Sequence, residues 1–428
     1  MKLEIFILII FQFKNYNFQI ILPFEKNKND IKDKFSFIEN ILDNKIITIL
    51  NIGTPIQKIP TFITFNENYF YISNNKIYNN NLSKTYMKEF DKEKDFTSEQ
   101  FKKGIISKES FIFKTIENKN IKIDNFSFIL ATDNLNVSLP SSSIGLKYKD
   151  YSSFLKGNLI YQLKDYSIIN SYIFSIQFTS KNKGNLIIGN YPHEFDNKHY
   201  SKKYFSFCKA ELDNQFSIFE TLFHKIQYDN FSDDIKYANF SINIDGIIGS
   251  KQYQKYIKKT FFDKFLISRK CIEGKSKNLN YIYYECDKNI DISKFNPIIF
   301  FHKYLNYTFI LDYNDLFEEI NERLYFKVIF NSFMVFKWTL GVPFLNKYQF
   351  IFDYDKKIFG FYRKILNYQF HYIIILLFFL LLIIIVLIII LIKIISSKKT
   401  RRIRANELND NFDYISKTNN FEYNKIIN

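Results

Sequence analysis

The chain has 428 residues, a formal net charge of +16 and a pI of about 9.3. This length allows two or more domain-sized cores. A basic chain could bind nucleic acid, but the lysines are scattered among Asn, Ile, Phe and Tyr and form no basic motif, so we expect no nucleic-acid partner.

The N-terminus is typical of a secretory signal peptide, which we place at residues 1–20. Lys2 precedes an apolar run at residues 5–13, which is broken only by Gln12. A run of this length suits the hydrophobic region of a signal peptide and is too short to cross a bilayer. The sequence therefore predicts entry into the secretory pathway.

From about residue 42 to residue 365, short runs of Ile, Phe and Tyr alternate with clusters of Asn, Asp, Lys and Ser. This pattern is typical of β-strands joined by turns, and the predicted fold class is all-β. A strand is predicted at 45–52, and hairpins are predicted at 172–190 and 348–362. Helical periodicity favours a short amphipathic helix at 251–265.

Five sequence blocks in this part occur in one order. The first half holds NIGTPIQ (51–57), SSSIGLKY (141–148) and SYIFSIQFTSKNKGNLIIGNYPHEF (171–195). The second half holds NPIIFFHKYLNYTFILDYNDL (296–316) and WTLGVPFLNKYQFIFDYDKKIFGFY (338–362). Together the blocks resemble the pepsin-like aspartic peptidase family over about residues 42–365.

The resemblance implies a bilobal pepsin-like fold, with an N-terminal β lobe at 42–195 and a C-terminal β lobe at 196–365. In that family each lobe supplies one catalytic aspartate, and the two carboxyl groups share a proton and hold a water molecule. A hairpin flap with a tyrosine covers the cleft between the lobes. Here Phe96 or Phe101 would stand in for that tyrosine.

The resemblance also implies that the catalytic pair is incomplete. Thr64 stands where the first catalytic aspartate belongs, and a threonine hydroxyl cannot act as a base near neutral or acidic pH. Asp245 is either a remnant of the second aspartate or an ordinary turn-forming residue. Gly145 and Gly341, which pack beneath the two catalytic loops in that family, are present. Because these positions persist without the catalytic ones, we expect an inactive monomer that binds a peptide or protein in its inter-lobe cleft.

Two other functions stay open. The chain could be an active aspartic endopeptidase with an unusual or misaligned catalytic pair, or a β-rich receptor or adhesion ectodomain with coincidental motifs. The five histidines show no metal-binding spacing, so neither a metal nor another cofactor is expected. Cys208 and His224 could form a thiol dyad, although a structural cysteine is the simpler interpretation.

Cysteines and glycosylation sequons fit an oxidising luminal compartment. Cys271 and Cys286 are close in sequence and within one predicted lobe, so we expect them to form a disulfide and to leave Cys208 as a thiol. Six Asn-x-Ser/Thr sequons precede the C-terminal apolar segment, and they are candidate glycosylation sites. They lie at Asn81, Asn125, Asn136, Asn230, Asn239 and Asn306.

Residues 373–392 are apolar without a single charge, and twenty residues of helix cover about 30 Å, the thickness of the hydrocarbon layer. We therefore predict a transmembrane helix there, with the lipid bilayer as its partner. Tyr368 and Tyr372 would lie at the interface, and six basic residues follow the segment. The positive-inside rule makes 393–428 a cytoplasmic tail, which we expect to be disordered. The prediction is a single-pass type I protein of the cell surface or an endolysosomal membrane.

Overall fold

The computed structural model describes residues 18–26, 34–42, 44–73, 78–89, 93–96, 102–133, 142–147, 157–209, 220–276, 280–331, 337–364 and 368–426. Residues 1–17 of the signal peptide predicted at 1–20 lie outside the described residues. The chain divides into two compact units, Met1–Ile365 and Leu366–Asn428. The first unit is mostly β-sheet, and the second is one long helix.

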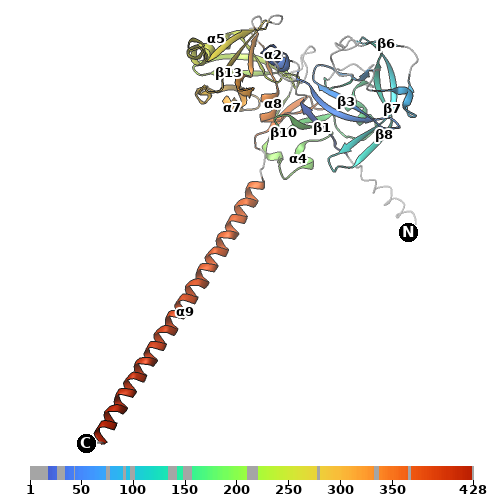
Figure 1. Cartoon of the computed structure of the whole chain (residues 1–428). Coiled ribbons are helices and arrows are strands. Elements are labelled where there is room, and N and C mark those ends of the chain that lie inside the picture. The colour runs from blue at the N-terminus through green and yellow to red at the C-terminus, as the bar shows by residue number, and fades with distance from the viewer. Residues whose placement is uncertain are drawn as a thin grey trace, which may run out of the picture. The chain divides into compact units, whose positions relative to one another are not determined.

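The first unit holds two sheets, and the larger has 14 strands among the described residues. Figure 1 labels β1, β3, β7, β8 and β10 of this sheet. In spatial order its strands are β12 (Phe205–Lys209), β25 (Ile358–Tyr362), β24 (Ile351–Asp353), β10 (Ile173–Ser180), β11 (Lys183–Ile188), β1 (Ile20–Lys26), β2 (Ile46–Ile52), β3 (Gln57–Thr64), β9 (Ser142–Gly145), β4 (Phe70–Ser73), β8 (Asn120–Ala131), β7 (Lys103–Thr115) and β5 (Met87–Lys88), and β6 (Lys94–Asp95) pairs with β7.

The smaller sheet has 11 strands in the described part of the chain. In spatial order they are β19 (Tyr307–Leu311), β18 (Ile298–His302), β13 (Glu220–Tyr228), β14 (Phe231–Phe240), β23 (Lys337–Leu340), β15 (Ile247–Ser250), β22 (Val328–Asn331), β17 (Tyr281–Asp287), β21 (Arg323–Phe326) and β20 (Phe317–Ile320), and β16 (Cys271–Lys275) pairs with β17.

Short helices cover the ends of these strands. They are α2 (Lys34–Leu42), α3 (Leu159–Asp165), α4 (Pro192–Phe195), α5 (Lys251–Ile257), α6 (Asp263–Ile267), α7 (Tyr313–Leu316) and α8 (Val342–Tyr348), with the single turns η1 (Asn80–Leu82), η3 (Lys202–Tyr204) and η5 (Ile292–Lys294). The π-helical turn η4 (Lys258–Phe262) joins α5 to α6, which confirms the helix predicted at 251–265. Its buried residues Tyr253, Ile257 and Phe261 are spaced four apart, as one face of a helix requires.

The predicted strand and both predicted hairpins are confirmed. Strand β2 alternates buried and more exposed residues, as a strand with one face on the core does. Strands β10 and β11 pair in antiparallel fashion with Phe174 opposite Ile188. Strands β24 and β25 pair in the same way, with Phe352 opposite Phe359. Each hairpin is a local structure, so the alternating pattern was enough to predict it.

Segments from both predicted lobes contribute to the larger sheet. Strands β12, β24 and β25 come from residues assigned to the C-terminal lobe, yet β24 pairs with β10 and β12 pairs with β25. Conversely, α2 precedes the N-terminal lobe and packs on the smaller sheet, where the rings of Phe37 and Tyr325 lie 4.2 Å apart. The lobe boundaries at 42–195 and 196–365 therefore stay a prediction.

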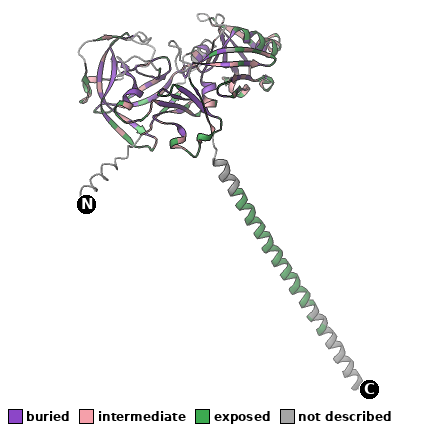
Figure 2. Ribbon diagram, turned by 180° about the vertical axis from the view of Figure 1, so that it is seen from behind, coloured by how far each residue is buried: buried purple, intermediate pink, exposed green. Residues whose placement is uncertain are grey.

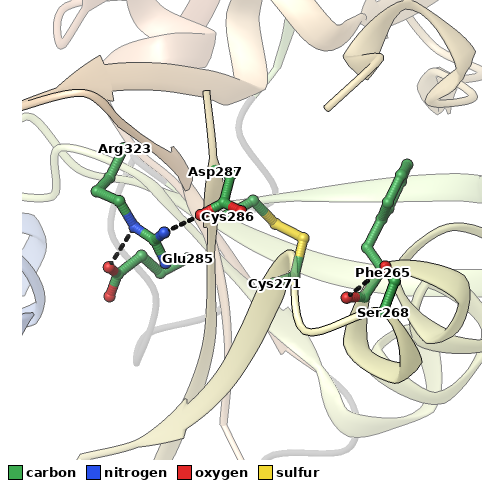
Figure 3. The surroundings of a disulfide bond; sticks show 7 residues. All are labelled: Phe265, Ser268, Cys271, Glu285, Cys286, Asp287 and Arg323. Atoms are coloured by element: carbon green, nitrogen blue, oxygen red, sulfur yellow. Dashed lines mark hydrogen bonds and ion pairs between the residues drawn. A yellow bond between two sulfur atoms is a disulfide. The ribbon is translucent and has the colours of Figure 1, made fainter. Parts of the chain in front are cut away.

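The predicted disulfide is confirmed and joins neighbouring strands (Figure 3). Cys271 and Cys286 face each other in the β16–β17 pair, and both are buried. Next to this bond, Arg323 donates to Glu285 Oε1 at 2.9 Å and also contacts Asp287. A bridge across 15 residues restricts the unfolded chain, which is worth about 3 kcal/mol.

The second unit consists of helix α9 (Tyr368–Ile426). Its segment Leu376–Arg404 is the one described helix that is long and apolar enough to cross a membrane, and none of it is buried (Figure 2). A membrane anchor fits this segment. The helix continues to Ile426, so the predicted disorder is wrong for residues 393–426. Extending an existing helix needs no new nucleation, and the Lys, Arg and Glu residues here are good helix formers.

Candidate functional site

Two loops carry the residues that the sequence singles out, and a glycine packs against each. The first loop follows β3, and the amide of Gly145 donates to the carbonyl of Tyr69 at 2.8 Å. The second loop follows β14, and the amide of Gly341 donates to the carbonyl of Gly246 at 3.1 Å.

Neither packing glycine has room for a side chain. A Cβ on Gly145 would lie 2.4 Å from the Glu67 carbonyl oxygen, and one on Gly341 would lie 2.2 Å from that of Ile244. The close backbone approach therefore requires glycine at both positions.

A neutral hydrogen-bond bridge joins the two loops. The Thr64 hydroxyl donates to Asn243 Oδ1 at 3.0 Å, and the amide of Phe65 donates to the same oxygen at 3.1 Å. Asn243 Nδ2 in turn donates to the carbonyl of Ile63 at 3.4 Å. The side chain that meets Thr64 is therefore an amide and not the carboxylate of Asp245. Nothing in the sequence distinguishes Asn243, because one Asn among many carries no local signal.

The side chain of Asp245 takes no part in these bridging hydrogen bonds and pairs with two lysines. Its side chain is buried, with 6 % of the residue exposed. One carboxylate oxygen contacts the ammonium group of Lys26, and the other lies 3.1 Å from that of Lys327. Its backbone amide donates to the carbonyl of Ile41 in α2 at 2.8 Å. Two positive charges therefore neutralise the carboxylate that was the candidate catalytic remnant.

Asp245 belongs to a chain of alternating charges, which we call the ion cluster: Lys26, Asp245, Lys327, Glu318 and Lys181. Lys327 Nζ lies 3.1 Å from Glu318 Oε2, and Lys181 Nζ lies 2.7 Å from Glu318 Oε1. Lys26 ends β1 and Lys181 follows β10, so both come from the larger sheet. The two carboxylates and Lys327 lie in or next to strands of the smaller sheet. The ion cluster thus connects the two sheets at both of its ends.

The charges of the ion cluster shift each other's pKa values. Burial alone would lower the pKa of Lys327, but the carboxylates of Asp245 and Glu318 outweigh it and raise the pKa above its usual value. Burial alone would raise the pKa of Glu318, but Lys327, Lys181 and Lys26 together lower it to about 2. Both groups therefore stay charged through the whole physiological range.

The other predicted site residues serve packing where the structure describes them. Phe96 is buried beside Tyr69, with ring centroids 5.6 Å apart, and its amide donates to the carbonyl of Lys102 at 2.7 Å. It is thus a core side chain in this structure. Phe101 lies outside the described residues. In the described part of the chain, no group of three or more His, Cys, Asp or Glu residues could hold a metal ion.

Cys208 lies beside His302 and not beside His224. The Cys208 sulfur is 4.0 Å from His302 Nε2, and the Thr221 hydroxyl is 2.8 Å from the same nitrogen. His302 Nδ1 accepts from the amide of Leu305 at 3.1 Å, so Nε2 carries the hydrogen. Burial, with a smaller effect of His224, lowers the pKa of His302 to about 4. A neutral imidazole that already donates from Nε2 cannot accept the thiol proton there.

No protein-family model matches the chain, and no curated protein matches it. The solved structure of basic 7S globulin from soybean matches with a TM-score of 0.60 and 14 % identity, over 82 % of this chain and 97 % of that one. Conglutin gamma, a basic 7S globulin from lupine seeds, matches with a TM-score of 0.59 and 12 % identity, over 82 % and 96 % of the two chains. At such low identity the likeness shows the fold alone.

These comparisons correct the family assignment. The two matched structures are basic 7S globulins and not pepsin-like aspartic peptidases, so the assignment to that peptidase family is wrong. The motifs that suggested it describe backbone geometry. In each motif a strand enters a tight loop, and Gly145 or Gly341 packs against that loop. Close packing of the backbone requires these glycines, so the motifs indicate a fold and not a catalytic activity.

The ion cluster predicts that Lys327→Met destabilises the protein. The change leaves Asp245 and Glu318 buried without the cation between them, so the free energy of unfolding should fall by about 3–5 kcal/mol. Urea unfolding of the detergent-solubilised full chain, followed by fluorescence of the buried Trp338, measures this. Lys183→Met removes the exposed pair with Glu25 and should cost less than about 1 kcal/mol. Equal effects of the two variants would contradict the prediction.

The low pKa of Glu318 predicts a pH dependence of stability. The pKa of Glu318 is about 2 in the folded chain, against 4.5 for an unperturbed glutamate, so its contribution to stability is complete above about pH 4.5 and is lost as pH falls toward 2. The stability difference between the native chain and Glu318→Gln should therefore shrink by about 2 kcal/mol between pH 6 and pH 3. Urea unfolding of both proteins at pH 6 and pH 3 tests this, and a constant difference would refute it.

Proposed function

We propose that this chain is a type I membrane protein whose luminal β-sheet unit binds a peptide or another protein without cleaving it. The pairing of Asp245 with Lys26 and Lys327 is the observation that supports this best. The proposed ligand site is a cleft between two lobes, bordered by the loops that follow β3 and β14.

Hydrolysis by a pair of acidic residues requires two carboxylates that share a proton beside a water molecule. In this chain Thr64 occupies one candidate position and binds the amide of Asn243. The carboxylate of Asp245 is held by two ammonium groups. Turning it toward a substrate would break both ion pairs and leave Lys327 with Glu318 alone, which is costly for a buried cation. Binding therefore fits these residues better than peptide hydrolysis.

The membrane part of the proposal rests on α9. Its apolar residues 373–392 match the hydrocarbon thickness, and the six basic residues at 393–404 favour the cytoplasmic side. With that orientation, the β-sheet unit faces the lumen or the outside. The disulfide between Cys271 and Cys286 suits such an oxidising compartment.

A cleavage and binding assay tests the central claim. The full-length protein in lipid discs is incubated with a broad fluorogenic peptide pool between about pH 3 and 7, and Trp338 fluorescence verifies its fold. We expect no turnover, and photo-crosslinking of a peptide subset to residues near the two loops. Asp245→Asn is compared with Asp291→Asn, an exposed aspartate paired with Lys294, as the matched control.

Two outcomes would overturn this proposal. Turnover that Asp245→Asn abolishes, that Asp291→Asn keeps and that an aspartic-peptidase transition-state inhibitor blocks would show an active endopeptidase. If the folded protein shows no cleavage and no crosslinking, peptide binding is refuted. That result would favour a receptor or adhesion role through another surface.

Glycosylation tests the orientation. Asn81, Asn125, Asn230 and Asn306 are exposed, so we expect glycans on all four in protein from a secretory host. Asn239 is half-buried, and its side-chain amide fits between Glu220 and Lys337, so the folded protein should lack a glycan there. Asn136 lies outside the described residues.

Enzymatic deglycosylation followed by mass spectrometry measures the glycan occupancy of each site. Asn→Gln variants assign each shift in gel mobility to one asparagine. Membrane-integrated protein without any glycan would contradict the luminal orientation.

A further inference from the structure

A small basic and aromatic surface adjoins the point where the β-sheet unit ends. We call it the anchor-side patch and define it as Lys202, Lys203, Tyr204, Phe207 and Lys364. The three lysines and Phe207 are exposed, Phe207 with 56 % of its surface accessible, and Tyr204 is half-buried. The Phe207 ring stacks on that of the half-buried Phe205, with ring centroids 5.7 Å apart, so two phenyl rings lie side by side at this edge of the sheet.

The fold ties this patch to the end of the unit. Strand β12 forms one edge of the larger sheet and pairs with β25, so Phe205 lies opposite Tyr362. The amide of Arg363 then donates to the carbonyl of Tyr204 at 2.9 Å, and its Nε donates to the Ser206 hydroxyl at 2.6 Å. The last described residues of the unit are thus fixed against the patch.

The patch is strongly positive. Residues 198–209 and 363–364 carry six basic side chains, and the nearest acidic residue along the chain, Asp196, pairs with His199. The ammonium groups of Lys203 and Lys364 each lie 5.9 Å from the centre of the Tyr204 ring. Basic side chains around aromatic rings are the composition that proteins present to the polar layer of a bilayer, where the rings lie among headgroups and the cations meet phosphates.

Chain length limits how far the patch can lie from the anchor. Three residues separate Lys364 from Tyr368, the first residue of α9. An extended chain spans at most about 3.6 Å per residue, so Lys364 and Tyr368 are at most about 14 Å apart. If α9 spans the bilayer, the lipid headgroups are within reach of the patch. Because the chain already holds the patch near the membrane, docking costs less entropy than binding from solution.

We infer that the anchor-side patch docks on the phosphate layer of the bilayer that holds α9, with Phe207 entering the headgroup region and the lysines binding lipid phosphates. This rests on the membrane anchorage proposed above. The docked patch fixes the face of the β-sheet unit that the membrane covers and so leaves the opposite face for ligands.

Quenching by headgroup spin-labelled lipid tests the docking in the full chain. A fluorophore on Lys209→Cys, two residues from Phe207, reports on the patch, and one on Ile267→Cys reports on an exposed position in the smaller sheet's part of the unit. All proteins carry Cys208→Ser, which removes the native thiol, and Asn306→Gln, which removes a possible glycan beside Leu305, whose carbonyl accepts from Arg363.

The decisive comparison is between two charge reversals of equal size. Lys202→Glu, Lys203→Glu and Lys364→Glu together change the patch, and Lys58→Glu, Lys84→Glu and Lys251→Glu change three exposed lysines elsewhere. We expect quenching at position 209 to fall at least two-fold with the first set and to stay unchanged with the second. Phe207→Ser should also lower the quenching at position 209. A comparison of discs with and without anionic lipid shows whether docking depends mainly on lipid phosphate groups or on the net charge of the membrane surface.

Each result decides one claim. Two results with protein that enters the lipid discs would overturn the docking while the anchorage stands. One is that the charge reversal in the patch leaves quenching at position 209 unchanged. The other is that positions 209 and 267 are quenched equally. Protein that fails to enter the discs overturns the anchorage and the docking with it.

Discussion

Lys327 is buried between the carboxylates of Asp245 and Glu318. The second partners of these carboxylates, Lys26 and Lys181, come from the larger sheet, so the two sheets are joined through these charges. A single buried charge would be very unfavourable, so the cluster is stable only when all its partners are in place. Those partners come from four separate places in the sequence, including β1 and the turn after β10. The ion cluster therefore selects one register between the sheets, which apolar packing alone specifies less sharply.

The loops around Thr64 and Asn243 are joined by neutral groups. Asp245 pairs with its lysines, and the connection between the two loops uses no charged side chain. The hydroxyl and amide satisfy each other, and backbone amides use the remaining acceptor capacity. Such a bridge can hold two loops in place, yet it offers neither a base nor an acid for hydrolysis.

Local features of this fold could be predicted from the sequence, and long-range ones could not. Strand β2, the hairpins and the Cys271–Cys286 pair involve neighbours along the chain, so alternation and spacing predicted them. The contact between Lys26 and Asp245 spans 219 positions, and no pattern in either segment indicates it. Strand β1 was missed because its first residue, Ile20, fell inside the segment assigned to the signal peptide. The short motifs correctly indicated two tightly packed glycines, Gly145 and Gly341, but the family they suggested was wrong.

Backbone geometry and side-chain chemistry carry different information in this chain. At 14 % identity to a matched structure, what persists is backbone geometry, because a Cβ at Gly341 would collide with a carbonyl whatever the protein does. Side chains that contact only each other are free to change together, as Thr64 with Asn243 and Asp245 with two lysines illustrate. Function therefore follows from which groups are already satisfied and which are exposed. By that criterion the loops are satisfied, and the exposed phenyl ring of Phe207 among lysines is the stronger indication of a contact.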